Sequence, residues 1–454
     1  MSSESTFLKY HKMPLLFMAL SSVLYLSFAY DLVRTDITKL ILLYIALFAF
    51  AFQLKKIAGF NFSILALSAI LFRFLFINAI PNLSQDFYRF IWDGRMIFEG
   101  FNPYLYTPDS FINNGQFPVH EAQELYNGMG SLSSGHFTNY PPLNQLCFFI
   151  AALFGGKSIM SAAIVMRLII ISADIGTLYF GKKLLERLRL PSSRIWWYIL
   201  NPFIIIELTG NLHFEGVMVF FLVWSLYLLH KGYFKWAAVV LACSISVKLI
   251  PLMFLPVFFW WFLSKSNTVK GGLLNLIIFY SIVGATILAL FLPFFSMEFI
   301  NNYSKTVGLW FGNFEFNASI YYLAREIGYA ITGYNEIAII GKILPVISLI
   351  CILSFSFFRK NKELTTLTSS LVLAFGIYLF LSTTVHPWYI ATLLVLSLFT
   401  NYRFPLIWSV VIILSYLAYS NSSNSENLWI IALEYIIVFS AFIWEVFLKK
   451  KIKI

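Results

Sequence analysis

The sequence predicts an all-α fold, a polytopic bundle of transmembrane helices, and three observations support this fold class. Of 454 residues, 59% are hydrophobic and only 12% are charged, well below the charged fraction of soluble domains. The apolar residues are collected in runs of roughly 20 residues, the length that an α-helix needs to cross the hydrocarbon core. The cations lie mainly in short turns between these runs, as the positive-inside rule expects.

The same composition excludes other classes of protein. The net charge of +11 comes from these turns, so it indicates membrane orientation and no nucleic-acid partner. Three cysteines lie in or beside apolar runs and show neither a disulfide framework nor metal spacing: Cys147, Cys243 and Cys351. Membrane lipids are therefore the expected surroundings of the chain.

Three apolar runs predict the first three crossings, at residues 14–32, 37–54 and 60–80. Lys9 and Lys12 precede the first run, and Lys55 and Lys56 follow the second, which predicts a cytoplasmic N-terminus. A signal peptide that is cleaved after Ala29 is the alternative, but an uncleaved first helix is preferred. The next segment begins outside in both cases.

The later runs alternate consistently between basic turns and raise the expected total to about 14 crossings with both termini cytoplasmic. These runs lie near residues 159–181, 194–210, 214–230, 235–248, 250–264, 272–294, 336–357, 365–384, 388–400, 404–421 and 428–446. The run 143–155 spans only roughly 20 Å as a helix, so we expect a re-entrant helix there. No repeat or linker is evident, and residues 1–454 are predicted to form one domain.

Two long loops are predicted on the non-cytoplasmic side, at about 81–140 and 295–335, and should form the functional face. In the first loop, Asp86, Arg89 and Asp93 recur at positions that share one face of a helix, while apolar residues occupy the opposite face. This pattern predicts an amphipathic helix at the membrane interface. On the pattern alone, a surface helix with a solvated ionic face is the favoured interpretation.

Further titratable residues lie in other turns on the same side. His213 and Glu215 flank a short turn between two crossings, which an ordinary polar turn would also explain. Lys248 follows an apolar stretch near the outer interface, where a lone cation either extends toward water or meets an anion such as a lipid phosphate. His386 lies among aromatic residues, as in an interfacial aromatic belt. Their convergence on one membrane face favours a site for group transfer from a lipid phosphate.

The motifs that carry these residues resemble a known family. The segment DFYRFIWDGR from Asp86, with Gly100-Phe-Asn-Pro-Tyr after it, resembles the first outer loop of bacterial GT-C glycosyltransferases. It is most similar to the polyprenyl-phosphate-mannose-dependent mannosyltransferases. Four weaker motifs follow in the order that this family shows: Tyr140-Pro-Pro-Leu, Asn211-Leu-His-Phe-Glu-Gly, Ser246-Val-Lys-Leu-Ile-Pro and Val385-His-Pro-Trp-Tyr. The resemblance spans roughly residues 80–390.

The resemblance implies an inverting mannosyl transfer from a polyprenyl-phosphate donor to a lipid or glycan acceptor, outside a bacterial plasma membrane. Asp86 would be the general base, and Lys248, assisted by Arg95 or His386, would stabilise the leaving phosphate. The catalytic residues that this predicts are Asp86, Asp93 and Glu215. The predicted substrate-binding residues are Arg89, Arg95, Tyr140, Gln145, Asn201, His213, Lys248, His386, Trp388 and Tyr389.

Two departures from the family pattern bear on cofactors. Many members carry two adjacent acids in the first loop, whereas this chain has Gln85 before Asp86 and its second acid at Asp93. Glu215 replaces the family's Asp after the histidine. We therefore expect no metal and no other cofactor, although a divalent cation remains an alternative.

A transporter or a lipid-linked-sugar flippase is the rival function, and a ligase that moves a whole glycan from a lipid diphosphate is a further one. Transporters hold functional charges near the midplane of the membrane. Six ionisable residues lie inside apolar runs, either as structural pairs or as parts of a path: Arg73, Arg167, Asp174, Glu207, Lys342 and Glu434.

Overall fold

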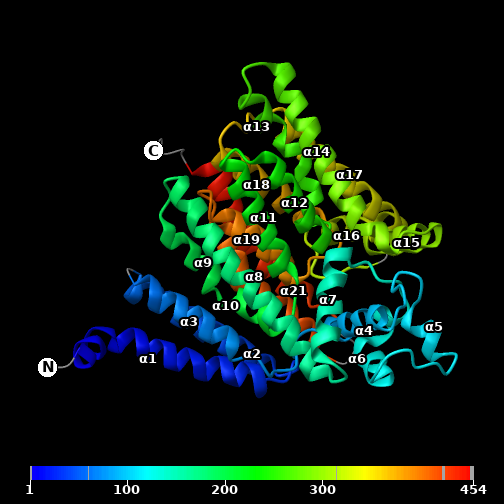
Figure 1. Ribbon diagram of the computed structural model, residues 1–454, viewed down its shortest axis with the longest axis horizontal. Helices are drawn as coiled ribbons and strands as arrows, with labels where there is room; N and C mark the ends of the chain where they lie inside the picture. The colour runs from blue at the N-terminus through cyan, green and yellow to red at the C-terminus, as the bar shows by residue number, and fades with distance from the viewer. Residues whose placement is uncertain (1–2, 60, 313, 422–424, 450–454) are drawn as a thin grey trace.

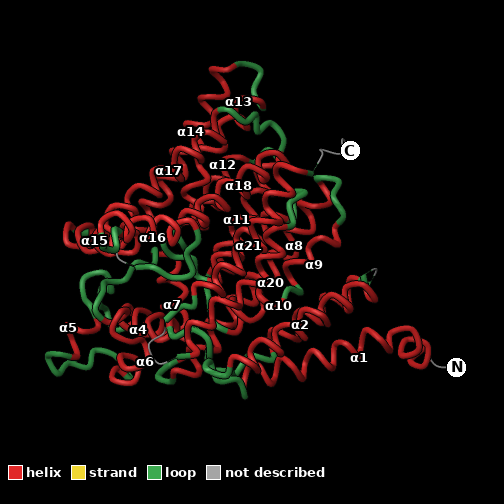
Figure 2. The backbone as a smooth tube through the Cα atoms, turned by 180° about the vertical axis from the view of Figure 1, so that it is seen from behind, coloured by secondary structure: helices red, strands yellow, loops and turns green. Residues whose placement is uncertain are grey.

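The computed structural model describes residues 3–59, 61–312, 314–421 and 425–449, and the described chain is all-α, as predicted (Figure 1). The one piece of extended pairing in these residues is an isolated bridge between Phe316 and Thr384. Figure 2 shows that helices make up nearly the whole backbone, while long loops gather around α4, α5 and α6.

An N-terminal hairpin lies along one side of the molecule (Figure 1). It consists of α1 (Ser3–Tyr30) and α2 (Ile37–Ala58), which pack against each other and are followed by α3 (Phe62–Phe74). The turn of the hairpin ends at Asp36, whose carboxylate accepts the backbone N–H of Lys39 and caps α2. Only 28% of the apolar window of each of the segments His11–Tyr30 and Ile37–Ala58 is buried, which suits helices that contact lipid.

The predicted first outer loop is mostly helical and occupies one end of the molecule. It contains α4 (Asp86–Phe98), α5 (Pro108–Ile112) and α6 (Ala122–Ser134), and α7 (Pro142–Gly155) follows it. Helix α4 packs against α6 and α7, and Gly94 permits the closest approach, because a Cβ there would lie 2.2 Å from the carbonyl oxygen of Phe148.

The ionic face of helix α4 is not solvated, although the pattern favoured a solvated face. Arg89, Asp93 and Arg95 are all at most 4% exposed, and so are the apolar residues of the opposite face from Phe87 to Ile91. The prediction fails because α6 and α7 cover the ionic face and supply partners for its charges. A helical pattern alone does not reveal such a second layer.

The centre of the bundle consists of long helices that pack against one another. They are α8 (Ile159–Arg187), α11 (Glu215–His230) and α12 (Phe234–Val247). Between α8 and α11 the chain forms short pieces, namely η1 (Ser192–Ile195), α9 (Trp196–Ile199), α10 (Pro202–Ile204) and the π-helix η2 (Ile205–Gly210). Residues 202–210 and α11 meet at a bend of 116°, which places the turn from Asn211 to Phe214 at one end of the bundle.

The C-terminal half surrounds this centre. Its elements in order are η3 (Ile250–Phe258), α13 (Phe259–Ser264), α14 (Val269–Phe291), η4 (Leu292–Phe294), α15 (Met297–Gly312), α16 (Ile320–Thr332), α17 (Ile337–Phe357), α18 (Leu364–Leu381), η5 (Pro387–Tyr389), α19 (Ile390–Ser397), α20 (Phe404–Val411), η6 (Ile412–Ser420), α21 (Leu428–Ile443) and η7 (Trp444–Leu448). The predicted second loop, 295–335, thus contains α15 and α16.

Seven helices in the described residues are long and apolar enough to cross a membrane, or eight if the bent pair counts as one span. The predicted total of about 14 crossings is not confirmed. Several predicted crossings are shorter helices of 10–17 residues, among them Phe62–Phe74, Phe234–Val247 and Ile250–Ser264. Helix α7, with 14 residues, is also too short by this measure, in agreement with the prediction of a partly inserted helix. The chain is an integral membrane protein.

Most of the ionisable residues inside apolar runs have partners within the bundle. Arg73 Nε contacts Asp174 Oδ2 at 2.7 Å, and both side chains are 2% exposed. Glu434 accepts hydrogen bonds from Trp408 and Asn317. Lys342, in contrast, is exposed on α17. Buried ions that are paired in this way are structural by default.

Candidate active site

A single arginine fixes the turn that carries His213. Arg167 on α8 donates to the carbonyl oxygens of Thr209 and Gly210 at the end of η2, and to those of Ile77 and Ala79 after α3. The guanidinium thereby joins the C-terminal end of η2 to the segment that follows α3. Carbonyl groups at the end of a helix have no partner within that helix. The side chain of Asn211 adds a second link, because its Oδ1 accepts the backbone N–H of Leu83 at 3.2 Å. These bonds bring the start of α4 beside the turn.

The contact between Asp86 and His213 is the centre of the site. Asp86 Oδ2 lies 4.0 Å from His213 Nε2, and the exposed fractions of the two side chains are 35% and 0%. On its other side, the His213 ring bonds the carbonyl oxygen of Glu207 through Nδ1 at 2.9 Å. A carbonyl oxygen only accepts, so Nδ1 carries the proton and Nε2 presents a lone pair toward Asp86.

Glu207 contacts the Nδ1 side of the His213 ring. Its carboxylate Oε2 lies 3.6 Å from His213 Nδ1, and both carboxylate oxygens accept the Tyr416 hydroxyl, at 2.9 and 3.0 Å. Tyr416 comes from η6, far along the chain. The Glu207 carboxylate is therefore anchored from a separate element.

An aromatic stack encloses the histidine. The Trp388 ring lies on His213 with centroids 3.7 Å apart, and His386 lies on Trp388 at 4.5 Å, so one indole separates two imidazoles. Tyr389 contacts the His386 ring at 5.5 Å. The predicted binding residues His213, His386, Trp388 and Tyr389 are thus brought together.

Lys248 and Glu215 form the other wall. Lys248 Nζ contacts Glu215 Oε1 at 2.5 Å, with 15% and 0% of the two side chains exposed. The ammonium also lies 5.9 Å from the centre of the Tyr140 ring. The expectation of a lone cation at Lys248 is therefore wrong, because Glu215 from the start of α11 supplies the anion. We call Asp86, Glu207, His213, Glu215 and Lys248 the Asp86 cluster.

Burial shifts the pKa values of the ionisable groups at this site. Burial raises the pKa of Asp86 to about 6, which the positive charge of Lys248 partly opposes and the negative charge of Glu215 reinforces. Burial, together with Lys248, lowers the pKa of His213 well below its usual value and that of His386 to about 3. Both imidazoles are therefore neutral near pH 7, and His386 does not supply the positive charge predicted for it.

Several polar atoms at the site are buried and have no hydrogen-bond partner in the described chain. They are Arg34 Nε, Asn211 Nδ2, His213 Nε2, Glu215 Oε2 and Ser246 Oγ. Buried polar groups are nearly always paired in native proteins. Other such atoms lie elsewhere in the described chain, but His213 Nε2 and Glu215 Oε2 belong to the Asp86 cluster itself and can bond a polar ligand.

Two other predicted residues of α4, Arg89 and Asp93, belong to a separate network. Arg89 Nε contacts Asp93 Oδ1 at 2.7 Å, and Gln145 Nε2 donates to Asp93 Oδ2 at 3.0 Å. The Arg89 guanidinium also bonds the carbonyl oxygens of Ser133 and His136. Asp86 does not take part in these bonds. Although the sequence predicts that Asp86, Arg89 and Asp93 share one face of the helix, Asp86 is therefore not part of the same hydrogen-bond network. We call Arg89, Asp93 and Gln145 the Asp93 network.

Two further predicted binding residues, Arg95 and Asn201, belong to neither the Asp86 cluster nor the Asp93 network. Arg95 bonds Glu121 Oε2 at 2.9 Å and the carbonyl oxygens of His120 and Lys157, which ties α4 to the loop before α6 and to the end of α7. Asn201 caps α10 and bonds the Ser409 hydroxyl at 3.0 Å. Their contacts are those of structural residues, and Arg95 is not placed to assist Lys248.

Within the described residues, no group of three or more His, Cys, Asp or Glu side chains is arranged to hold a metal ion. Two acids of the Asp86 cluster already have charged or polar neighbours: Glu215 is bonded to Lys248, and Asp86 faces His213. Whether a divalent cation takes part stays a prediction.

The sequence did not predict that Arg34 and Tyr416 contribute to the site. It showed Glu207 only as an ionisable residue inside an apolar run and not as a partner of His213. Arg34 lies in the turn between α1 and α2, and its guanidinium carbon lies 3.1 Å from the centre of the Tyr419 ring. A signal for it was present, since a cation in a predicted outer turn departs from the positive-inside rule. No sequence signal pairs Tyr416 with Glu207.

The fold and the site define a polytopic membrane protein with a buried cluster of acids, a neutral imidazole and cations at one end of its bundle. A family model described as "Alpha-(1->6)-mannopyranosyltransferase, N-terminal domain" matches residues 23–264, more than half of the chain. The chain belongs to this family. The match contains every residue of the Asp86 cluster and confirms the resemblance to mannosyltransferases that the motifs predict.

Two curated relatives carry the same name, alpha-(1->6)-mannopyranosyltransferase A. The protein from Corynebacterium glutamicum is 24% identical over 185 residues, which cover 40% of this chain and 36% of the relative. The protein from Mycobacterium tuberculosis is 21% identical over 194 residues, or 42% of this chain and 36% of the relative. The chain thus matches little more than a third of each relative's length.

Proposed function

We propose that this protein transfers mannose from a polyprenyl-phosphate-linked donor to a hydroxyl group of a lipid or glycan acceptor, on the non-cytoplasmic face of the membrane. The observation that carries the proposal is the Asp86 carboxylate, partly open and 4.0 Å from the lone pair of a neutral histidine, in a chain of a mannosyltransferase family. A lipid-linked donor also accounts for a polar site at the end of an apolar bundle.

Asp86 is the general base in this proposal. Its carboxylate takes the proton of the acceptor hydroxyl while the oxygen attacks the anomeric carbon of the donor. The bond between that carbon and the phosphate oxygen breaks, and polyprenyl phosphate leaves. A single displacement inverts the anomeric configuration. A pKa of about 6 leaves Asp86 ionised at pH 7 yet more basic than an ordinary aspartate, which suits this role.

His213 positions a substrate hydroxyl beside Asp86. Its Nε2 is fully buried, accepts only, and has no partner in the described chain. A hydroxyl group between Nε2 and Oδ2 would have an acceptor on each side, so a sugar with neighbouring hydroxyls can bond both. The bond from Nδ1 to Glu207 and the Trp388 stack hold the ring in this orientation.

Lys248 is proposed to face the donor phosphate, with Glu215 sharing its charge and orienting its ammonium group. Removal of one partner would leave a buried, uncompensated charge, so the pair must act as a unit. Tyr140 and Tyr389 complete the wall beside them. Asp93, predicted as a second catalytic acid, is proposed instead to support α4 through Arg89.

A transporter or flippase is the alternative function. It would need ionisable groups along a path through the bundle. The candidates for such a path are mostly bonded within the bundle: Arg73 to Asp174, and Arg167 to four carbonyl groups. These contacts favour a structural role and therefore the enzyme.

Sugar transfer by the purified protein in detergent tests the proposal, because no transporter performs it. We expect transfer from a short-chain polyprenyl-phosphate mannose to a mannoside acceptor, with the new linkage established by mass spectrometry and NMR. Loss of one lipid-linked or surface glycan in a deletion strain should identify the acceptor. A monodisperse protein that transfers no sugar from any polyprenyl-phosphate donor would refute the enzymatic function.

A further inference from the structure

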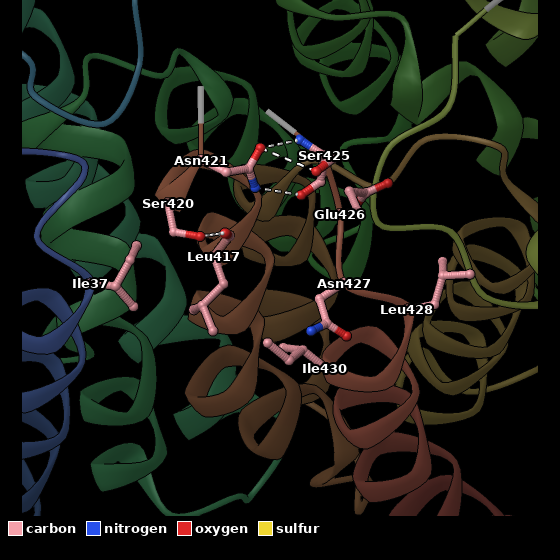
Figure 3. A pocket seen from close by; sticks show the side chains of 9 residues that line it. All are labelled: Ile37, Leu417, Ser420, Asn421, Ser425, Glu426, Asn427, Leu428 and Ile430. Atoms are coloured by element: carbon pink, nitrogen blue, oxygen red, sulfur yellow. Dashed lines mark hydrogen bonds between the residues drawn. The ribbon is translucent and has the colours of Figure 1, made fainter. Parts of the chain in front are cut away.

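Helix α2 connects two different ends of the molecule. Ile37 at its start lines a pocket with residues of the loop before α21 (Figure 3), and the charge of Arg34, three residues earlier, reaches Asp86. Lys55 lies in the last turn of the same helix, whose 22 residues span about 33 Å. Lys55 is therefore at the end of the bundle opposite to the Asp86 cluster.

An aromatic ring holds Lys55 in place. Its ammonium group lies 3.5 Å from the centre of the Trp197 ring on α9. Phe52 precedes Lys55 by three residues on the same face of α2, and its ring lies 6.2 Å from that of Trp197. The indole thus contacts a cation at the end of α2 and an apolar ring one turn further into the bundle.

Arg194 in η1 brings a second cation to this place. Its Nη1 group donates to the carbonyl oxygens of Leu398 and Thr400, at 3.3 and 2.7 Å, and so ties η1 to the turn before α20. These bonds use one nitrogen of the guanidinium and leave Nε and Nη2 without a hydrogen-bond partner in the described chain. Trp197 follows Arg194 by three residues, so the ring under Lys55 is one turn away.

Arg403 is the third cation, and its charge acts on the other two. It follows Thr400 in the same turn, and its side chain is exposed. Burial lowers the pKa of Arg194, and the positive charge of Arg403 lowers it further. The charge of Arg403 also repels that of Lys55. Like charges from three separate segments therefore converge here. We call Lys55, Arg194 and Arg403 the basic cluster.

No carboxylate of the described chain forms an ion pair with the basic cluster. Glu445 contacts Arg403, but at the backbone. Its Oε2 accepts the N–H groups of Arg403 and Phe404, at 2.7 and 2.9 Å, and thereby bonds the first amides of α20. By contrast, Lys248 at the other end of the bundle is paired with Glu215. The basic cluster is thus a place where an anion from outside the chain would relieve repulsion.

Apolar surface adjoins the basic cluster. Phe52, one turn from Lys55 toward the middle of α2, is 52% exposed. On η7, which carries Glu445, the side chains of Trp444 and Phe447 are 53% and 71% exposed. A ligand that joins a phosphate to acyl chains would use both surfaces, whereas a free phosphate would use only the cations.

We propose that the basic cluster binds the phosphodiester group of an anionic phospholipid, whose acyl chains lie along Phe52 and Trp197. The two guanidinium groups suit this ligand, because each presents paired donors to phosphate oxygens. In the proposed topology this end of the bundle faces the cytoplasm, where basic sites between helices bind anionic head groups. The lipid would join α2 to η1 and to the turn before α20, and so hold the N-terminal hairpin against the bundle. The inference does not depend on the proposed sugar transfer.

Lipid binding by the purified full chain in detergent tests the site. Native mass spectrometry with phosphatidylglycerol should show that Arg403→Gln weakens binding roughly 10-fold, as expected for the loss of a charge-assisted hydrogen bond. Arg403→Lys should recover part of the affinity. Arg359→Gln is the matched control, because it removes an arginine from a different turn, between α17 and α18. Equal unfolding midpoints in lipid-free detergent establish that the variants are folded.

Two further ligands identify what the basic cluster recognises. Phosphatidylcholine with the same acyl chains has no net charge and should bind the wild type less tightly than phosphatidylglycerol. Phe52→Ala should weaken phosphatidylglycerol and leave inorganic phosphate unaffected. If inorganic phosphate binds the wild type as tightly as phosphatidylglycerol, the ligand is a free phosphate and the lipid assignment is overturned.

Thermal unfolding gives an independent measurement. Phosphatidylglycerol should raise the unfolding midpoint of the wild type and of Arg359→Gln, because it binds the folded state, and should raise that of Arg403→Gln less. Equal binding of the two phospholipids, unchanged binding in Arg403→Gln, or an equal loss in Arg403→Gln and Arg359→Gln would overturn the inference. A protein that binds phosphatidylglycerol through Arg403 but transfers no mannose would contradict only the proposed function.

Discussion

Helix α4 carries two aspartates in opposite surroundings, Asp86 at its start and Asp93 about two turns further along. Asp93 is fully buried, and both of its oxygens are occupied, by Arg89 at 2.7 Å and by Gln145 at 3.0 Å. Asp86 is 35% exposed and faces a histidine nitrogen that itself has no partner in the described chain. A carboxylate whose lone pairs are already used holds helices together, whereas one with open lone pairs and a raised pKa can accept a proton.

Asp86→Asn should remove the proposed base and cause the largest effect of the variants considered. Turnover should fall about 10²- to 10⁴-fold, because the amide keeps the size of the side chain but cannot act as a base. Binding of farnesyl phosphate and the unfolding midpoint should stay near wild type. The measurement is transfer from a short-chain polyprenyl-phosphate mannose by monodisperse protein.

The matched variants decide which acid is the base. If Asp86→Asn keeps wild-type turnover while Asp93→Asn or Glu215→Gln is inactive, the base has been assigned to the wrong residue. Retention of transfer by all three variants would show that the reaction takes place elsewhere.

Lys248→Met should change the pH dependence and the donor kinetics. Asp86 acts in its ionised form, so wild-type kcat/KM should rise with pH through about 6 and be lost below it. The Lys248 charge lowers the pKa of Asp86, so its removal should move this rise to higher pH and increase the donor KM. Lys39→Met, equal in charge change, should leave the profile in place. Unchanged donor kinetics and an unchanged profile would exclude Lys248 from the phosphate site.

Asp93→Asn should affect stability more than turnover. The substitution leaves the Arg89 guanidinium buried without its counter-charge, a loss that typically costs about 3–5 kcal/mol. The unfolding midpoint should therefore drop, while the remaining folded protein keeps most of its turnover. A variant with normal stability but little activity would instead place Asp93 among the catalytic groups and remove the contrast with Asp86.

Labelling of single introduced cysteines should show on which side of the membrane the α4–α7 segment lies, without changing activity. Asn113, after α5, and Lys360, after α17, are both exposed. With the α4–α7 segment outside, Asn113→Cys should react with an impermeant maleimide in intact cells, and Lys360→Cys only after the cells are opened. Labelling of the Lys360 site alone in intact cells would invert the proposed topology.

Much of this protein follows from local features of the sequence. Apolar runs and basic turns predict an all-α membrane protein because lipid requires every backbone polar group to be bonded within its own segment. The motifs around Asp86, His213, Glu215 and Lys248 predict the family, and these four residues do meet. The number of crossings does not follow, because an apolar run can also form a short buried helix such as α12 or the pieces of η3 and α13.

Only the tertiary structure decides which charged side chains contact one another. Arg167 joins the end of η2 to the chain after α3, and this contact sets Asp86 beside His213. Lys248 receives its anion from Glu215 on a different helix, and Arg34 reaches Tyr419 from the opposite part of the chain. Sequence periodicity places a side chain on one face of its own helix, but the covering element comes from a distant segment. The partner of a buried charge, and hence its pKa and its role, is therefore set by packing.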